Sequence, residues 1–471
     1  MTGGGLAPEP VTLGTAAGRW LITVTVLASG MAFLDATAVT VALPSIGADL
    51  HSSLAGLQWT VTAYTLALAA LILLGGSLGD RYGRRKVFLI GVAWFAAASL
   101  VCGLAPGTGW LAAARAVQGV GGALLTPGSL ALLQSSFRPA DRARAIGLWS
   151  ALGGVAGLIG PFLGGALVDA LSWRLVFLVN VPVALVIVTV GARHVPESRA
   201  DRTNGRFDVA GAVLGASALG GVTYALIAAG SDPADPAVAV TGALGLLAGA
   251  GFVQRERRAA FPMLPLRVFD DRQFTGANLS TLAVYGALGG VSLFLVLQLQ
   301  TVLGWSAAAA GAALLPSSAL LILLSPRMGA LVGRIGARVP MTVGPLIAAA
   351  GALWLSGVDG RQPYAVDVLP GSLLQGLGMA VTVTPLTATV LAAAPDALAG
   401  VASGVNNAVA RAGQLLAVAA LPVAVGLSGR DYARPEVFAA GYRTALMACA
   451  VLFALGGAVS WFTIRGDVLR E

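Results

Sequence analysis

A short basic loop between two long apolar stretches is the feature that most restricts the fold of this chain. Residues 75–86 read Gly-Gly-Ser-Leu-Gly-Asp-Arg-Tyr-Gly-Arg-Arg-Lys and place four cations together. A degraded copy follows 253 residues later, at 329–338, where the glycines and arginines recur but Gly333 replaces the acid Asp80. A basic loop repeated between apolar segments indicates two related helix bundles in a membrane, which is an arrangement found mostly in transporters.

The composition supports a membrane protein. Hydrophobic residues make up 57% of the chain and charged residues 11%, whereas soluble domains carry about 25% charged residues. We therefore expect an all-α integral membrane protein whose backbone polar groups are satisfied within helices. The net charge of +8 does not indicate a nucleic-acid partner, because the arginines fall in short loops, where they set membrane orientation.

The hydropathy pattern predicts fourteen transmembrane helices, each long enough to cross a hydrocarbon core of about 30 Å. Residues 115–123 and 372–380 share the pattern Gln-Gly-x-Gly, so the repeat extends beyond the loops. We therefore expect two pseudo-symmetric six-helix bundles, at 1–194 and 273–471, and a segment at 195–272 with linkers and two inserted central helices. The expected spans are 20–43, 56–76, 87–105, 109–132, 143–168, 173–193, 207–229, 235–254, 273–299, 306–325, 340–357, 364–391, 399–427 and 443–463.

The distribution of cationic residues predicts the orientation. If the N-terminus lies in the cytoplasm, 22 of the 29 lysines and arginines fall in inner segments and 5 in outer loops. Cytoplasmic loops are enriched in these residues. We therefore expect a multi-pass protein of the plasma membrane with both termini in the cytoplasm.

Four motifs occur in order along the chain. Residues 34–44 read Leu-Asp-Ala-Thr-Ala-Val-Thr-Val-Ala-Leu-Pro, 75–86 contain G-x-L-x-D-R-x-G-R-R, 115–119 contain R-x-x-Q-G, and 153–165 contain G-x-x-x-G-x-x-G-P-x-x-G-G. Together they resemble the motifs of the major facilitator superfamily, and of its fourteen-helix drug/proton antiporters of the multidrug efflux type. One departure is Thr40, which stands where that signature usually has an asparagine.

The resemblance implies a conformational latch in the first basic loop. Asp80 would contact the opposite bundle at the N-terminus of the thirteenth helix, where the helix dipole stabilises a carboxylate. The alternative is a loop that only sets orientation, but such a loop would not require the acid. The residues of the expected latch are Gly76, Asp80, Arg81, Gly83, Arg84 and Arg85.

The glycine motif of the fifth helix is expected to form a joint between the bundles. Small residues at this spacing allow helices to pack backbone to backbone, and a proline adds a kink. Close packing without a role in the conformational change is the alternative. The motif comprises Gly153, Gly157, Gly160, Pro161, Gly164 and Gly165.

Asp35 is the strongest candidate for chemistry. It is the one acid deep inside an expected span, where a carboxylate costs about 2.5–3.5 kcal/mol on insertion scales and is functional by default. At a rise of about 1.5 Å per residue, Asp35 and Arg115 lie at similar depths in the same bundle. We expect Asp35 to couple transport to protons and Arg115 to tune it, whereas the alternative is a structural ion pair.

Further polar and aromatic residues are candidates for the substrate region. Arg411 lies in the thirteenth helix near Asn406 and Asn407, and it either lines the region or is satisfied by packing. Aromatic side chains at helical spacing are more often packing than ligand contacts. The aromatic candidates are Trp59, Tyr64 and Tyr285, with Phe33, Trp149 and Asn278 on further expected inner faces.

These patterns predict a proton-coupled secondary transporter, acting as a monomer, that exports a hydrophobic small molecule or drug, cations included, by alternating access. No cofactor or metal is expected, because two histidines cannot build a histidine-based zinc site and the sequence has no ATP-binding P-loop. A proton-coupled uptake symporter for a nutrient and a non-transporting membrane receptor are the alternatives. An enzyme is not expected, because the spans contain no nucleophile or metal cluster.

Overall fold

The computed structural model describes residues 11–199, 208–259, 262–395 and 398–466. These residues contain fourteen helices that are long and apolar enough to cross a membrane, which confirms the predicted number. Parts of the expected linkers, at 200–207 and 260–261, lie outside the described residues. Apart from one isolated bridge between Val11 and Phe137, the described structure is helical, as predicted.

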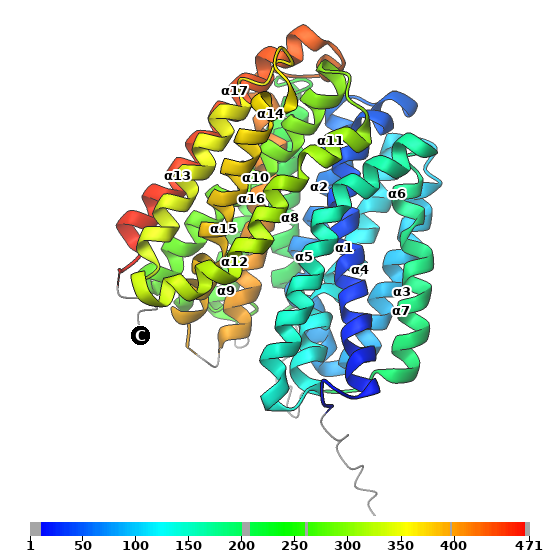
Figure 1. The fold of residues 1–471 in the computed structure, drawn as a ribbon, viewed down its shortest axis with the longest axis vertical. Coiled ribbons are helices and arrows are strands. Elements are labelled where there is room, and N and C mark those ends of the chain that lie inside the picture. The colour runs from blue at the N-terminus through cyan, green and yellow to red at the C-terminus, as the bar shows by residue number, and fades with distance from the viewer. Residues whose placement is uncertain (1–10, 200–207, 260–261, 396–397, 467–471) are drawn as a thin grey trace, which may run out of the picture.

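Two groups of helices form the body of the molecule (Figure 1). We call the end at which the first helix begins the inner end and the opposite end the outer end. The N-terminal bundle consists of α1 (Ala16–Asp49), α2 (Leu54–Tyr82), α3 (Arg84–Gly103), α4 (Thr108–Ser136), α5 (Pro139–Ala170), α6 (Leu175–Leu178) and α7 (Asn180–His194). The C-terminal bundle consists of α10 (Arg272–Leu297) with η2 (Gln298–Val302), α11 (Ala307–Ala313), α12 (Leu315–Ile335), α13 (Arg338–Leu355), α14 (Tyr364–Asp367), α15 (Leu369–Ala392), α16 (Ala399–Ala424) and α17 (Pro435–Thr463).

Helices begin where a short polar side chain can satisfy the first free N–H groups. Thr15 accepts a hydrogen bond from the amide of Gly18 at the start of α1. Ser53 does the same for α2, and Asp271 for α10. The caps fix the chain positions at which the apolar stretches enter the helices.

The repeat seen in the sequence recurs in the backbone. Gly83 ends α2 with φ +114°, and Gly336 ends α12 with φ +77°, a left-handed region that favours glycine. A Cβ at Gly119 would overlap the carbonyl oxygen of Tyr64 in α2, and one at Gly376 would overlap that of Ser317 in α12. The two bundles therefore use equivalent glycines at equivalent helix crossings.

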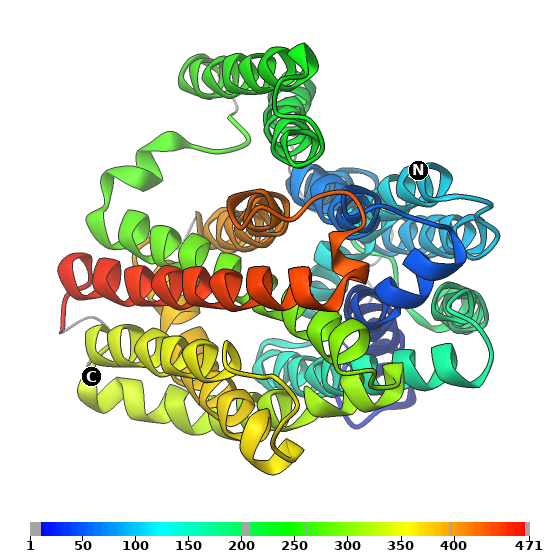
Figure 2. The same cartoon turned by 90° about the horizontal axis from the view of Figure 1, so that it is seen from above.

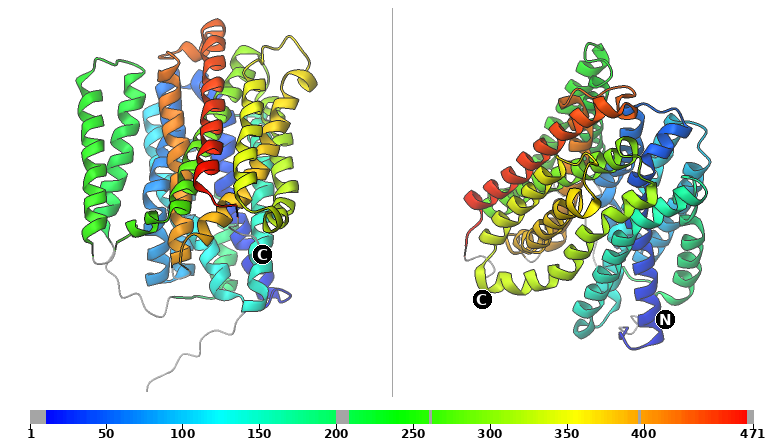
Figure 3. Two further views of the ribbon diagram at one scale, coloured as in Figure 1. Left: turned by 90° about the vertical axis from the view of Figure 1, so that its left-hand side faces the viewer. Right: turned by 45° about the horizontal axis from the view of Figure 1, so that its top comes forward.

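The two inserted helices, α8 (Val209–Ala229) and α9 (Pro236–Arg258), are central in the sequence but peripheral in space. They form a pair at the edge of the molecule (Figures 2 and 3). α8 contacts α2 of the N-terminal bundle and α16 of the C-terminal bundle. Only a small part of α9 is buried within the protein, so its apolar surface is available to lipid.

The hydrogen bonds between the bundles lie at the outer end in the described residues. Gln58, near the outer start of α2, donates to the carbonyl oxygen of Val418 at 2.7 Å. Gln300 donates to that of Val41 at 2.8 Å, and Tyr432 donates to that of Ser52 at 2.9 Å. Toward the inner end the two groups of helices diverge (Figure 1). The bundles are therefore joined at their outer ends.

Candidate functional site

A buried ion pair lies inside the N-terminal bundle. The sequence placed Asp35 and Arg115 at similar depths, and the structure puts them in contact, with Arg115 Nη1 2.5 Å from Asp35 Oδ2. The two side chains are 0% and 1% exposed. α1 and α4 position them, because each residue lies on the buried face of its helix.

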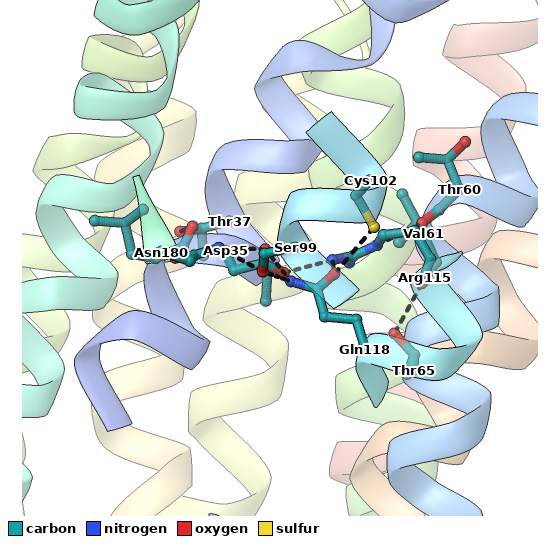
Figure 4. A network of polar contacts seen from close by, with 12 residues as sticks. Asp35, Thr37, Thr60, Val61, Thr65, Ser99, Cys102, Arg115, Gln118 and Asn180 are labelled. Carbon is teal, nitrogen blue, oxygen red and sulfur yellow. Dashed lines mark hydrogen bonds and ion pairs between the residues drawn. The ribbon is translucent and has the colours of Figure 1, made fainter. Parts of the chain in front are cut away.

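Amide side chains complete the surroundings of the carboxylate (Figure 4). Gln118 Nε2 donates to Asp35 Oδ1 at 2.8 Å, and Asn180 Nδ2 donates to the same oxygen at 3.0 Å. Both amides also donate to the hydroxyl of Ser99. Since every partner of Asp35 is a donor, the arrangement fits an ionised carboxylate, which only accepts hydrogen bonds.

Arg115 is equally well satisfied. Its Nε donates to the carbonyl oxygen of Thr60 at 3.0 Å, and its Nη1 donates to Gln118 Oε1 at 2.6 Å. Its guanidinium carbon lies 4.3 Å from the ring centroid of Tyr64 and 5.7 Å from that of Phe177, which are cation–π distances. A proton that neutralised Asp35 would remove the counter-charge of Arg115, so protonation requires this network to rearrange.

Arg411 lies on the other side of the region between the bundles. It is midway along α16 and half-buried. α16 packs against α2, which carries Tyr64, and against α10, which carries Tyr285. Whether Arg411, Tyr64 and Tyr285 form one substrate region stays a prediction.

Other candidates lie elsewhere. Asn406 donates to the hydroxyl of Thr281 at 2.8 Å and to Asn278 Oδ1 at 3.3 Å, so both asparagines pack inside the C-terminal bundle. Asn407 is exposed and donates to the carbonyl oxygen of Ser403. Trp149 donates to the hydroxyl of Ser29 within the N-terminal bundle.

Trp59 faces the peripheral helix pair and not the region between the bundles. Its ring lies 6.1 Å from that of Tyr224 in α8. It also lines an apolar cavity of about 290 Å³, together with Leu66 and with Ala216 of α8. Spacing alone placed it on an inner face, because the sequence does not show which helices cover that face of α2. Phe33 is 42% exposed, so it is not enclosed in a site either.

Asp80, the acid of the expected latch, contacts its own loop in the described residues. Asp80 is 42% exposed, and its Oδ1 accepts from Arg84 Nε and Nη2, both at 2.8 Å. A Cβ at Gly76 would lie 3.6 Å from Pro127 of α4, and Arg81 is exposed. The expected contact with α16 is therefore absent among the described residues, which accords with bundles that are joined at the other end.

Glu197 binds the backbone at the end of the basic loop. Its two carboxylate oxygens accept from the backbone amides of Arg85 and Lys86 at the start of α3, where the helix dipole favours an anion. A Cβ at Gly83 would lie 2.9 Å from this carboxyl group. The sequence analysis missed Glu197, although an acid among the arginines after the sixth span was an available signal.

The glycine motif of α5 is divided between two neighbours. A Cβ at Gly160 or Gly164 would overlap Thr37 or Ala38 of α1, and a Cβ at Gly165 would overlap Ala307 of α11. The carbonyl of Pro161 packs against Gly311 of α11 in the same way.

The inner half of the motif does not pack closely. Gly153 has only an ordinary contact with Phe33, and nothing lies within 4 Å of a Cβ at Gly157. The expectation that Gly157 forms part of a close helix contact is therefore wrong in this arrangement. The neighbouring Gly154, on another face of α5, lies in ordinary contact distance of Ile322 in α12.

An acid at the end of α5 joins the two bundles. Asp169 Oδ1 accepts from the amide of Ala307 at 3.0 Å, and its Oδ2 accepts from that of Ala308 at 2.8 Å. The sequence analysis missed this residue, because an acid at the end of a span is common. It also missed Asn180, although a single amide in the apolar run of the sixth span was a usable signal.

The fold and the site define a two-bundle secondary transporter. The sequence profile of the Major Facilitator Superfamily matches residues 25–418, and the chain belongs to this superfamily.

Curated relatives match most of the chain. It is 39% identical over 406 residues to the multidrug resistance protein Stp of Mycobacterium tuberculosis, covering 84% of this chain and 74% of that protein. It is 37% identical to the tetracenomycin C resistance and export protein of Streptomyces glaucescens, covering 83% and 73%. It is 35% identical to the multidrug efflux pump LfrA of Mycolicibacterium smegmatis, covering 82% and 77%.

Solved structures share the fold at low sequence identity. A bacterial homologue of the human lysosomal transporter Spinster, in an inward-facing and unoccupied conformation, aligns with a TM-score of 0.67 at 18% identity. The alignment covers 96% of this chain and 97% of that one. A POT peptide transporter in complex with sulfate aligns with a TM-score of 0.69 at 16% identity, covering 96% of each chain.

Proposed function

We propose that this chain exports hydrophobic small molecules, antibiotics and other drugs among them, in exchange for protons. The observation that carries the proposal is the fully buried pair of Asp35 and Arg115 inside one of two bundles, which are hydrogen-bonded to each other at the outer end in the described residues. Buried acids within membrane helices are a feature of proton relays. The relatives named as multidrug resistance, efflux and export proteins support the direction of transport.

Proton coupling follows from the hydrogen-bond inventory of Asp35. Its present partners are all donors, so an added proton would turn one accepting oxygen into a donor that faces other donors. Arg115 would then lose its counter-charge and keep only neutral acceptors, the carbonyl oxygen of Thr60 and Gln118 Oε1. In this mechanism the proton comes from the outer side, and its release to the inner side restores the pair.

Alternating access would use the two ends of the bundles in turn. We propose that the units at 1–194 and 273–471 rock about the region that contains Arg411 and Tyr285. With the outer ends joined, that region opens inward and Asp80 turns to Arg84. In the opposite state Asp80 would engage the N-terminus of α16. A single chain supplies both units, which supports a monomer. We place both termini in the cytoplasm of a plasma-membrane protein.

Two alternative functions are an uptake symporter and a membrane receptor. A symporter could use the same fold, and a receptor would not need to bind a proton. Efflux is favoured over uptake because the relatives are exporters by name. Transport is favoured over reception because a receptor has no need for a desolvated carboxylate that can bind a proton.

The test uses reconstituted vesicles. First, the chain is expressed in a host that lacks its own efflux pumps, and antibiotics whose inhibitory concentration rises are identified. One such antibiotic is then added to vesicles that carry a pH-sensitive dye. We expect substrate-dependent proton movement opposite to substrate movement. Movement of both in the same direction would establish a symporter, and resistance with no proton movement would remove the coupling role of Asp35.

A further inference from the structure

Arg411 is a charged side chain without a partner in the middle of a membrane helix. It lies midway along α16 and is half-buried. Among the described residues its guanidinium makes no hydrogen bond and no ion pair. A charge at this depth is costly and is normally paired, or faces a pathway for a substrate or ion. Five N–H donors in a fixed fork are therefore available to a ligand.

The site has no comparable free anion. Asp35 is 0% exposed and accepts hydrogen bonds from Arg115, Gln118 and Asn180. A cationic substrate would have to displace one of these donors and leave the buried charge of Arg115 without its counter-ion, which is strongly unfavourable. Because Asp35 and Arg115 neutralise each other, the positive charge of Arg411 is left uncompensated among the described residues of the spans.

The surroundings of Arg411 suit an aromatic ligand. The helix that carries Arg411, α16, packs against α2, the helix of Tyr64, and against α10, the helix of Tyr285, so it lies where the two bundles meet. The ring of Tyr64 already packs against Arg115 and Phe95, whereas Tyr285 is half-buried. The exposed Asn407 is one helical turn from Arg411 on the same face of α16, because residues four apart share a helix face.

We infer that the exported substrates are aromatic or otherwise apolar molecules that carry an acidic group, such as a carboxylate or an ionised phenol, and that Arg411 binds this group. The inference rests on the proposed export function. It assigns anionic substrates where the sequence analysis had included cations. Arginine binds carboxylates through two parallel hydrogen bonds. Tyr285 is placed to contact the apolar part of the molecule.

Substrate charge also decides how membrane voltage acts on the exchange. When one proton enters and one monovalent anion leaves, the equivalent of two positive charges moves inward. An inside-negative potential therefore drives the export of an anion. When one proton enters and a monovalent cation leaves, no net charge moves, so the potential has no effect.

Two dyes on the same xanthene framework test the inference. Fluorescein is an anion and tetramethylrhodamine methyl ester is a cation, so their binding to the purified full-length chain compares charge at similar shape. We expect the wild type to bind fluorescein more tightly. Arg411→Gln should weaken fluorescein binding by about tenfold, the loss of one charge-assisted contact. Arg411→Lys should keep most of the binding, and Arg443→Gln, at an exposed position of α17, should keep all of it.

The same dyes are then followed in vesicles with an imposed potential. Fluorescein export should accelerate when the interior is made negative. Tighter binding of the cationic dye, binding of neither dye, or unchanged fluorescein binding in Arg411→Gln would overturn the inference. If the anion binds through Arg411 but no proton moves during its transport, the proposed coupling fails while the charge selectivity stands.

Discussion

Asp169 at the outer end of α5 caps the amide of Ala307, the first residue of α11, at 3.0 Å. At the inner end of the same bundle, Asp80 instead pairs with Arg84 of its own loop. Both carboxylates belong to the N-terminal bundle, one at its outer end and one at its inner end. In this structure the outer one is engaged with the opposite bundle and the inner one is not.

Asp169→Asn should shift the protein toward the state that is open at the outer end. The amide keeps the size of the side chain but loses the charge that is stabilised at a helix N-terminus, which is worth about 0.3–1 kcal/mol. A cysteine introduced at the exposed Asn407, on the Arg411 face of α16, should then be labelled more slowly by a thiol reagent. The native Cys102 and Cys449 are buried and give little background. Unchanged labelling would show that Asp169 does not hold the outer end.

Asp80→Asn should act in the opposite direction. We expect lower transport with nearly normal insertion and expression, because the inner end loses the charge proposed to engage α16 in the other state. Labelling at position 407 should become faster or stay at its maximum. Wild-type transport rates in Asp80→Asn would show that Asp80 does not act as a latch.

Asp35 variants separate coupling from folding. Asp35→Asn should reach the membrane, allow downhill substrate movement and fail to drive uphill export from a proton gradient. Asp35→Glu should retain part of the activity with a shifted pH optimum. Asp35→Ala leaves Arg115 buried without its counter-ion and should destabilise the fold by about 3–5 kcal/mol. The coupling role is refuted if vesicles with Asp35→Asn show substrate-dependent proton movement at the normal rate.

The glycines of α5 offer a matched pair of substitutions. Gly164→Leu should abolish transport and reduce the yield of folded protein, because its side chain would overlap Ala38 of α1. Gly157→Leu should give a normal yield, since nothing lies within 4 Å of a Cβ there. Yield and transport are measured together for both. Equal yields of the two variants would mean that the contact between α5 and α1 does not constrain the fold.

The orientation has a direct test. Reporter fusions after Asp201 and after Arg258 should both report the cytoplasm, and a fusion after Asp232, between α8 and α9, should report the outside. Position 201 lies outside the described residues, so this experiment also examines the expected linker. Opposite locations for 201 and 258 would mean that the α8–α9 pair does not cross the membrane twice.

Much of the fold could be predicted because its signals are local. Apolar length gave the number of spans, and the repeated loop gave the two halves. The pairing of Asp35 with Arg115 followed from depth alone, because both helices belong to one bundle. Asn180 was missed, since the direction of an amide side chain depends on which helices pack around it.

Other features depend on contacts between the halves. Spacing placed Gly157 with Gly160, but only Gly160 packs closely, against Thr37 of α1. Similarly, Trp59 fits an inner face by periodicity, and only the position of α8 shows that it faces the peripheral pair. Sequence periodicity identifies helix faces without identifying their neighbours.

The position of the α8–α9 pair affects how molecules reach the protein from the bilayer. The pair lies along the seam where α2 and α16 meet, so lipid-dissolved compounds approaching from that side encounter two additional helices. The seam on the other side, between α5 and α12, has the small residue Gly154 against Ile322. Among the described residues no helix pair covers that side, so the two seams of the same molecule meet the bilayer differently.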